Sequence, residues 1–313
     1  MISRRLIIAS LMYFALALSV AAPARAADKV IRVGTLKLIH TLTPYFYNRF
    51  APPGYKVEVI PFETPTDAKN AVVSKSVDFG VYGLSAATMG AAMGEPVVVI
   101  APSCNRGMAI VVKKGEHIDS FKQLKGKRIG ILPGTTQESV FFERLKEEGM
   151  SIKDVHPVRV EFSEMASALA RGDIDAYLGA EPGPTISVLR GVGKVLEYPY
   201  GTPMGSVNIV LTTRADTVKN DPELVKLILN LHRKASEYAM SHREELAKIA
   251  SAKLGLSTTV AIKAADNVEF TWKADPAWVK ESKYYGSLML RQKQIRKLPD
   301  YNTFFAFTPG PKS

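Results

Sequence analysis

The stretch from residue 128 to residue 142 combines residue types that suit the binding of an anion. It reads Arg-Ile-Gly-Ile-Leu-Pro-Gly-Thr-Thr-Gln-Glu-Ser-Val-Phe-Phe, which predicts a short strand, a Pro-Gly turn and the start of a helix. Thr135 and Glu138 have the spacing of a helix capping box, and Gly134 leaves room for an approaching group. The N–H groups and the dipole at a helix start attract negative charge. The stretch therefore predicts either an anion-binding turn or an ordinary strand-to-helix connection.

The same pattern occurs twice in the chain, which indicates a doubled structural unit. The segment 32–36 matches the segment 128–132. Farther on, Asp78 before an apolar strand corresponds to Asp175 before another, at nearly the same offset. Each copy reads as strands that alternate with helices, which is typical of parallel sheets.

Loops at the carboxyl ends of parallel strands are expected to line a ligand crevice. Four loops qualify, namely 37–43, 83–85, 133–136 and 180–182. Ser85 opens a helix rich in alanine and glycine, so a second helix N-terminus is expected to face the same crevice as Thr135 and Thr136.

Two further strands, Gly107–Lys113 and Gly205–Thr212, begin with glycine and flank the second copy. Each is expected to cross between two lobes, so that the pair forms a hinge. Each lobe should contain a mostly parallel sheet flanked by helices. Met204 lies in a Pro- and Gly-rich stretch just before the return crossing, and it is a candidate for the floor of the crevice. The resulting division is lobe one at 27–112 plus 207–313 and an inserted lobe two at 113–206.

Residues 1–26 have the features of an export signal that is removed from the mature protein. Two arginines precede a long apolar run, and Ala24-Arg25-Ala26 has the form of a cleavage site. A membrane anchor fits less well, because small residues follow the apolar run. We therefore expect a mature chain that begins at Ala27 and works in the periplasm. The formal net charge is +11, but the basic residues are scattered, so nucleic acid is not expected as a partner.

The sequence gives little support for cofactor, metal or covalent chemistry. The segment 130–136 lacks the lysine of a P-loop, and Gly191-Val192-Gly193 lacks the third glycine of a dinucleotide fingerprint. Five scattered histidines show no metal-ligand spacing. The single cysteine, Cys104, is either a reactive thiol near Arg106 or a small buried apolar residue. We expect no cofactor and no metal.

Together these segments resemble the extracytoplasmic solute-binding proteins of ABC importers, in particular the sulfonate, nitrate and taurine and thiamine-pyrimidine-precursor group. The resemblance covers essentially the whole mature chain. It is carried by the segments 31–34, 76–80, 95–99, 121–130, 133–136 and 171–176. It implies an α/β protein with the two-lobed type II fold of periplasmic binding proteins, which closes on its solute by a hinge motion. It further implies a monomer without enzymatic activity, whose partners are a small solute and an ABC permease in the inner membrane.

The resemblance also points, position by position, to residues that bind the solute. They are Lys37, His40, Thr41, Ser85, Asn105, Arg106, Gly134, Thr135, Thr136 and Glu181. Cations at Lys37, His40 and Arg106, together with helix-end N–H groups, would suit a sulfonate or another organic oxyanion. This class is the first prediction for the solute, which is expected to be anionic.

Three alternatives remain open. A nitrogen heterocycle such as a thiamine-pyrimidine precursor would stack on aromatic rings and bond to Glu181. Tyr82 and Tyr177 are candidates for this contact, since they lie near the ends of two strands that feed crevice loops. The second alternative is a stand-alone enzyme that uses the same fold to act on a small acid. The third is a ligand-sensing subunit for a membrane receptor.

Overall fold

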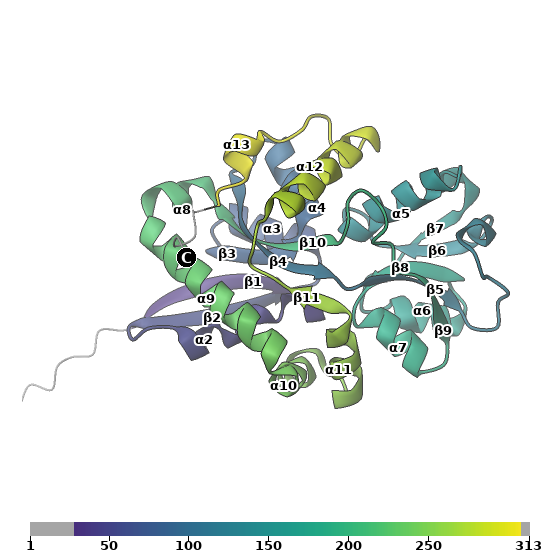
Figure 1. The fold of residues 1–313 in the computed structure, drawn as a ribbon, viewed down its shortest axis with the longest axis horizontal. Coiled ribbons are helices and arrows are strands. Elements are labelled where there is room, and N and C mark those ends of the chain that lie inside the picture. Colours follow the sequence, from purple (N-terminus) through teal and green to yellow (C-terminus); the bar gives the residue numbers. More distant parts are fainter. Residues whose placement is uncertain (1–27, 308–313) are drawn as a thin grey trace, which may run out of the picture.

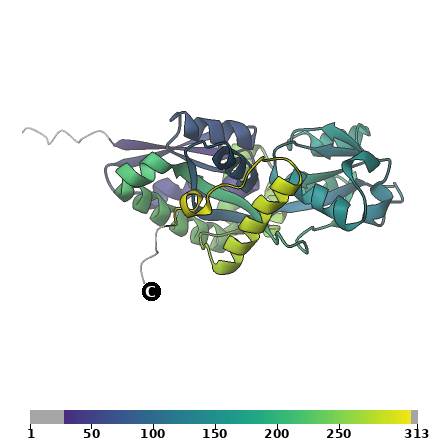
Figure 2. The same ribbon diagram turned by 90° about the horizontal axis from the view of Figure 1, so that it is seen from above.

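The computed structural model describes residues 28–307 and contains two α/β lobes, each built on one sheet (Figure 1). The predicted two-lobed α/β fold class is confirmed. The predicted export signal at 1–26 lies outside the described residues. Figure 2 shows the two lobes side by side along the long axis of the molecule.

The first sheet has six strands in the order β11-β4-β10-β3-β1-β2. Its strands are β1 (Lys29–Leu36), β2 (Tyr55–Phe62), β3 (Phe79–Gly83), β4 (Val97–Arg106), β10 (Val207–Arg214) and β11 (Val268–Phe270). Every residue of β3 and β10 is buried, because helices cover both faces of the sheet.

The second sheet has five strands in the order β7-β6-β8-β5-β9. Its strands are β5 (Met108–Lys113), β6 (Arg128–Ile131), β7 (His156–Arg159), β8 (Ala176–Ala180) and β9 (Gly193–Glu197). The central strand β8 is again buried throughout.

Both sheets are mixed, and most strands of each sheet run in one direction, as predicted. In the first sheet β1 pairs in parallel with β2 and β3, whereas the pairs of β10 with β3 and of β4 with β10 and β11 are antiparallel. In the second sheet β5 runs antiparallel to β8 and β9. The reversed strands are β10 and β11 in the first sheet and β5 in the second, so β1–β4 share one direction and β6–β9 share another.

The predicted doubling of the chain is visible in two equivalent sets of hydrogen bonds. The Asp78 carboxylate accepts from the backbone N–H of Arg32 at 2.7 Å, and the Asp175 carboxylate accepts from that of Arg128 at 2.8 Å. In return, the N–H of each aspartate donates to the carbonyl of the same arginine. Asp78 therefore connects the start of β3 to β1, and Asp175 connects the start of β8 to β6.

The chain crosses between the sheets at Arg106 and Gly107. Both residues have positive φ, at 62° and 72°, so the backbone turns sharply after β4. The next strand, β5, already pairs with β8 and β9 of the second sheet. By sheet membership, the crossing predicted at 112–113 therefore lies at 106–107, because the glycine turn separates the two sheets. Residues 198–206 make the return connection.

Helices surround both sheets. The first sheet carries α2 (Tyr47–Phe50), α3 (Pro65–Val73), α4 (Leu84–Ala92), α8 (Ala215–Asn220), α9 (Pro222–Ser241), α10 (Arg243–Leu254), α11 (Thr258–Asp266), α12 (Pro276–Arg291) and α13 (Tyr301–Phe304), and the second carries α5 (Thr136–Glu147), α6 (Met165–Arg171) and α7 (Gly183–Leu189). Short 3-10 turns lie at Ile39–Thr41, Thr43–Phe46, Phe121–Leu124 and Ile152–Asp154. No helix in the described range 28–307 is long and apolar enough to span a bilayer.

The long helix α9 illustrates how the sequence sets these elements. Its first turn has Pro222, and the carboxylate of Asp221 accepts from the N–H of Leu224 at 3.1 Å, which caps the helix. Leu224, Ile228 and Leu231 lie on one face and are buried against the first sheet. Helix α12 begins in the same way with Asp275 and packs on α4, β10 and, in the other lobe, α5.

Candidate functional site

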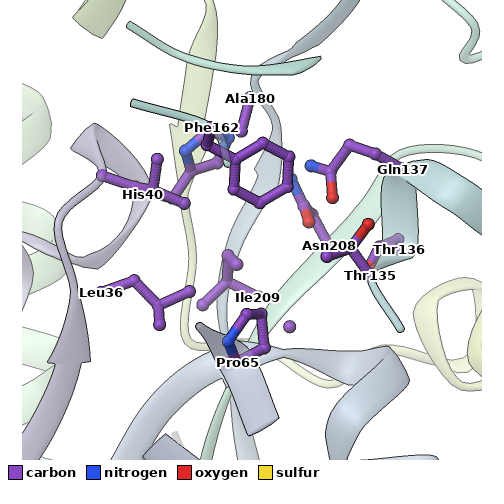
Figure 3. A pocket seen from close by; sticks show the side chains of 12 residues that line it. Leu36, His40, Pro65, Thr135, Thr136, Gln137, Phe162, Ala180, Asn208 and Ile209 are labelled. Carbon is purple, nitrogen blue, oxygen red and sulfur yellow. The ribbon is translucent and has the colours of Figure 1, made fainter. Parts of the chain in front are cut away.

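A pocket lies between the two lobes, at the carboxyl ends of their parallel strands (Figure 3). It is lined by Leu36, Leu38, His40, Pro65, Gly83, Asn208 and Ile209 from the first lobe and by Thr135, Thr136, Gln137, Phe162 and Ala180 from the second. Its volume of about 10 Å³ holds about one water molecule. All four loops predicted to line a crevice reach this region, so the parallel-sheet argument located the site.

Two helices from different lobes begin at this pocket. Helix α4 starts directly after Gly83, and α5 starts after Thr135. A Cβ atom on Gly83 would lie 3.3 Å from the Thr136 hydroxyl, so glycine lets the two helix starts approach closely. Their combined N–H groups and dipoles favour negative charge or acceptor oxygens between them.

The start of α5 is held by hydrogen bonds within its own turn. The Thr135 hydroxyl donates to the carbonyl of Leu132 at 2.7 Å and accepts from the N–H of Glu138 at 3.3 Å. The Glu138 carboxylate accepts from the N–H of Gly134 at 2.8 Å, one residue before the position that a capping box predicts. The side chain of Thr135 and the N–H of Gly134 therefore shape the turn.

Ser85 and Gly134 join the two lobes directly. The Ser85 hydroxyl, which is fully buried, donates to the carbonyl oxygen of Gly134 at 2.8 Å. Both residues were predicted at the site, and the structure brings them into contact with each other. In this structure the two lobes are therefore closed on the pocket.

Three buried polar atoms of the lining residues have no hydrogen-bond partner. They are Oγ1 of Thr136, Nδ1 of His40 and Oδ1 of Asn208. His40 is fully buried, and this burial lowers the pKa of its imidazole to about 4, so the ring is neutral at pH 7. Buried polar atoms usually find a partner, so these three are candidates for contact with a solute.

The predicted cations do not form a positive crevice. Lys37 makes an ion pair with Glu63 and is half exposed. Arg106 is exposed, and its guanidinium lies 5.3 Å from the centre of the Tyr200 ring. Neither residue lines the pocket, and the third predicted cation, His40, is neutral.

Two other predicted residues have structural roles in the first lobe. The Thr41 hydroxyl donates to the carbonyl of Leu36 at 2.6 Å and so shapes the loop that carries His40. Asn105 pairs through its backbone with Val207 in the first sheet and does not line the pocket.

The side chains proposed for ring stacking lie in the core. Tyr82 and Tyr177 are fully buried and do not line the pocket, and the hydroxyl of Tyr177 bonds to that of Ser187 at 2.8 Å. Met204 is also fully buried within the core and outside the pocket lining. The aromatic ring that does reach the pocket is Phe162.

Glu181 connects the lobes beside the crossing. Its carboxylate accepts from the side-chain amide of Asn267, in the first lobe, at 2.7 Å and from the N–H of Thr185 at 3.2 Å. Its N–H donates to the carbonyl of Gly107. Burial raises the pKa of the Glu181 carboxyl to about 7, against the hydrogen bonds from Asn267 and Thr185. Glu181 itself does not line the pocket, whereas its neighbour Ala180 does.

Sequence reasoning missed several lining residues. Pro65 and Phe162 follow β2 and β7, the equivalent second strands of the two copies, so the rule that selected the four loops would also have found them. Gln137 could also have been predicted, since it lies in the first turn of the helix that was expected to begin at the crevice. Asn208 opens a strand that was treated only as a crossing, and no local signal marks it.

The cysteine alternatives are decided by burial. Cys104 is fully buried in β4, and burial raises the pKa of its thiol far above the ordinary value, so it is an inert core residue. The described part of the chain holds no group of three or more metal-binding side chains.

Comparisons with known proteins identify the relatives of this chain. A family model described as NMT1/THI5 like matches residues 49–246. A Bacillus subtilis protein provisionally named for the binding of aliphatic sulfonates is 24% identical over 248 residues, which are 77% of this chain and 74% of that protein. The structure of the periplasmic aliphatic sulphonate binding protein of Escherichia coli matches with a TM-score of 0.77, at 18% identity, over 92% of this chain and 96% of that chain.

One relative is an enzyme. The 4-amino-5-hydroxymethyl-2-methylpyrimidine phosphate synthase of Schizosaccharomyces pombe is 28% identical over 129 residues, which are 41% of this chain and 37% of that protein. The chain is therefore similar both to proteins named for solute binding and to one named for pyrimidine synthesis.

Proposed function

This chain belongs to the NMT1/THI5-like family, and from this premise we propose that it is the solute-binding component of an ABC importer. The observation that carries the proposal is the pocket between two lobes, with a helix N-terminus from each lobe pointing at it. In this proposal the chain is exported by the segment 1–26, captures a solute outside the cytoplasm and delivers it to a membrane permease. No bond is made or broken in the solute.

The proposed solute is a small organic oxyanion, with a sulfonate as the first candidate. The described lining residues carry no lysine or arginine, so the negative charge would be balanced by helix-end N–H groups and by the Thr136 hydroxyl. Two relatives are named for the binding of aliphatic sulfonates, which supports the same class of solute. The proposal therefore replaces the cationic crevice with a neutral site rich in hydrogen-bond donors.

Capture requires that the lobes separate. A space of about 10 Å³ admits about one water molecule, far less than a sulfonate. The turn at Arg106–Gly107 and the connection 198–206 are the segments that join the sheets, so a hinge motion would take place there. Solute binding would then favour a closed state that is slightly wider than the one described.

A nitrogen heterocycle is the second candidate. Phe162 is an aromatic ring in the pocket lining, and a planar solute would stack on it. The pyrimidine enzyme among the relatives supports this alternative. The buried Cys104 thiol is not an available nucleophile, and in this alternative too the chain is proposed to bind the heterocycle without converting it.

A thermal-shift screen of residues 27–313 tests the proposal. The compounds are alkyl and aryl sulfonates, nitrate, carboxylates and thiamine-pyrimidine precursors. A solute at 100 times its Kd should stabilise the fold by about 2.7 kcal/mol, which a melting curve resolves. A shift with sulfonates supports the first candidate, and a shift with heterocycles alone replaces it with the second. Turnover of any of these compounds would overturn the binding-protein assignment.

A further inference from the structure

The carbonyl oxygen of Arg106, at the crossing between the lobes, anchors two side chains of the pocket. Nδ2 of Asn208 donates to it at 2.8 Å, and Nε2 of His40 lies 3.3 Å from it. A carbonyl oxygen can only accept hydrogen bonds, so both nitrogens that face it carry hydrogen. This contact fixes the amide orientation of Asn208 and the tautomer of His40.

The remaining polar atom of each side chain is consequently an acceptor. Oδ1 of Asn208 and Nδ1 of His40 both present lone pairs, because the neutral imidazole has only one N–H. Both atoms are buried without a partner, and both side chains line the pocket (Figure 3). Asn208 is 1% exposed and His40 is fully buried.

The lining of the pocket therefore contains both donor groups and acceptor groups. The start of α5, with Thr136 and Gln137, offers N–H and O–H donors. Asn208 and His40 offer acceptors only. A plain oxyanion supplies acceptor oxygens to the donors at the start of α5 and leaves the acceptor atoms of Asn208 and His40 unpaired, which is unfavourable for buried polar atoms.

We propose that Asn208 and His40 select solutes that carry a hydrogen-bond donor in addition to an oxyanion group. This inference rests on the proposed function as an oxyanion-binding protein. The ligand class is a small bipolar molecule with an ammonium, amide N–H or hydroxyl group a few bonds away from its anionic oxygens. The donor group would meet Asn208 and His40, and the oxyanion would meet the N–H groups at the start of α5.

Isothermal titration calorimetry with matched sulfonates tests the inference. The probes are 2-aminoethanesulfonate, 2-hydroxyethanesulfonate and ethanesulfonate, which differ only in the donor. The wild-type protein should bind at least one donor-bearing probe about tenfold or more tightly than ethanesulfonate. Asn208→Leu should reduce this ratio to about threefold or less, and His40→Phe serves as a second variant of the same kind. Asn230→Leu, on the exposed side of α9, is the matched control and should keep the wild-type ratio.

The outcomes separate the two proposals. Equal affinity of the wild-type protein for all three sulfonates would overturn the donor requirement and leave the oxyanion function standing. Binding of none of them, alongside binding of a heterocycle in the thermal screen, would overturn the oxyanion function and this inference with it. A donor preference that survives in both Asn208→Leu and His40→Phe would remove these residues as its source.

Discussion

The hydroxyl of Ser85 reaches across the crevice and donates to the carbonyl oxygen of Gly134 at 2.8 Å. Ser85 belongs to α4 of the first lobe, and Gly134 precedes α5 of the second. The N–H of Gly134 donates to the Glu138 carboxylate, so this residue is held in place within its own lobe. The bond between the two lobes can form only when the lobes close.

Ser85→Ala should therefore weaken solute binding by destabilising the closed state. A neutral hydrogen bond contributes about 1 kcal/mol, which corresponds to about a fivefold higher Kd. Titration calorimetry with the solute identified by the thermal screen measures this change. Ser74→Ala is the control, because the Ser74 hydroxyl bonds to Ala71 and Ser76 within the same lobe. Equal Kd values for Ser85→Ala and wild type would show that this bond does not hold the lobes together.

Tyr284→Phe should increase the rate of solute dissociation. The Tyr284 hydroxyl, on α12, donates to the Glu143 carboxylate of α5 at 2.9 Å, outside the solute pocket. The contact belongs to the closed state, so its loss should speed opening severalfold and leave the association rate nearly unchanged. Stopped-flow fluorescence measures both rates. Tyr55→Phe, on β2, is the control, and a change confined to the association rate would contradict the prediction.

The two neighbouring threonines of the α5 start should respond differently to mutation. Thr135→Ala removes a helix cap and should lower the unfolding free energy by about 1 kcal/mol. Thr136→Val removes a buried hydroxyl without a partner, so stability should hold, while affinity for an oxyanion falls about tenfold. Urea unfolding and calorimetry of both variants make the comparison. An unchanged affinity of Thr136→Val would exclude its hydroxyl from the site.

The sequence predicted the location of the site because that location depends on topology. The two copies of the strand-helix unit place their carboxyl ends at one crevice, and the glycine at 107 marks the first crossing. The helix start after Thr135 follows from a local rule, since a threonine N-cap begins helices in any context, whereas α4 begins at Leu84, one residue before the predicted start at Ser85. Such features depend on neighbours within a few residues.

The directions of the long side chains could not be predicted. Lys37 pairs with Glu63 and Arg106 lies over Tyr200, so each cation is engaged by a residue far away in the sequence. Both side chains have several rotatable bonds, and only the folded surroundings select one direction. Asn208 is the opposite case, because an asparagine at the start of an apolar strand gains its role only when the strand meets the Arg106 carbonyl.

Glu181 provides a pH dependence of known sign. Burial raises its carboxyl pKa from the ordinary 4.5 to about 7, so between these values the native protein binds a proton that the unfolded chain has released. The contribution of Glu181 to stability is therefore greatest below pH 4.5 and declines as the pH rises through this window to 7. The full change is about 3 kcal/mol. The neutral buried rings of His40 and His232, with pKa values lowered to about 4 by burial, act in the opposite direction.

Glu181→Gln should abolish the contribution of this carboxyl and keep an oxygen that accepts from Asn267. The unfolding free energy of the variant should therefore rise relative to wild type by about 3 kcal/mol between pH 4.5 and pH 7.5. Urea unfolding of both proteins at pH 4.5, 6.0 and 7.5 measures the difference. The histidine contributions cancel, because both proteins contain His40 and His232. A difference that stays constant across the three pH values would show that Glu181 titrates as an ordinary exposed carboxylate, with the bridge to Asn267 open in solution.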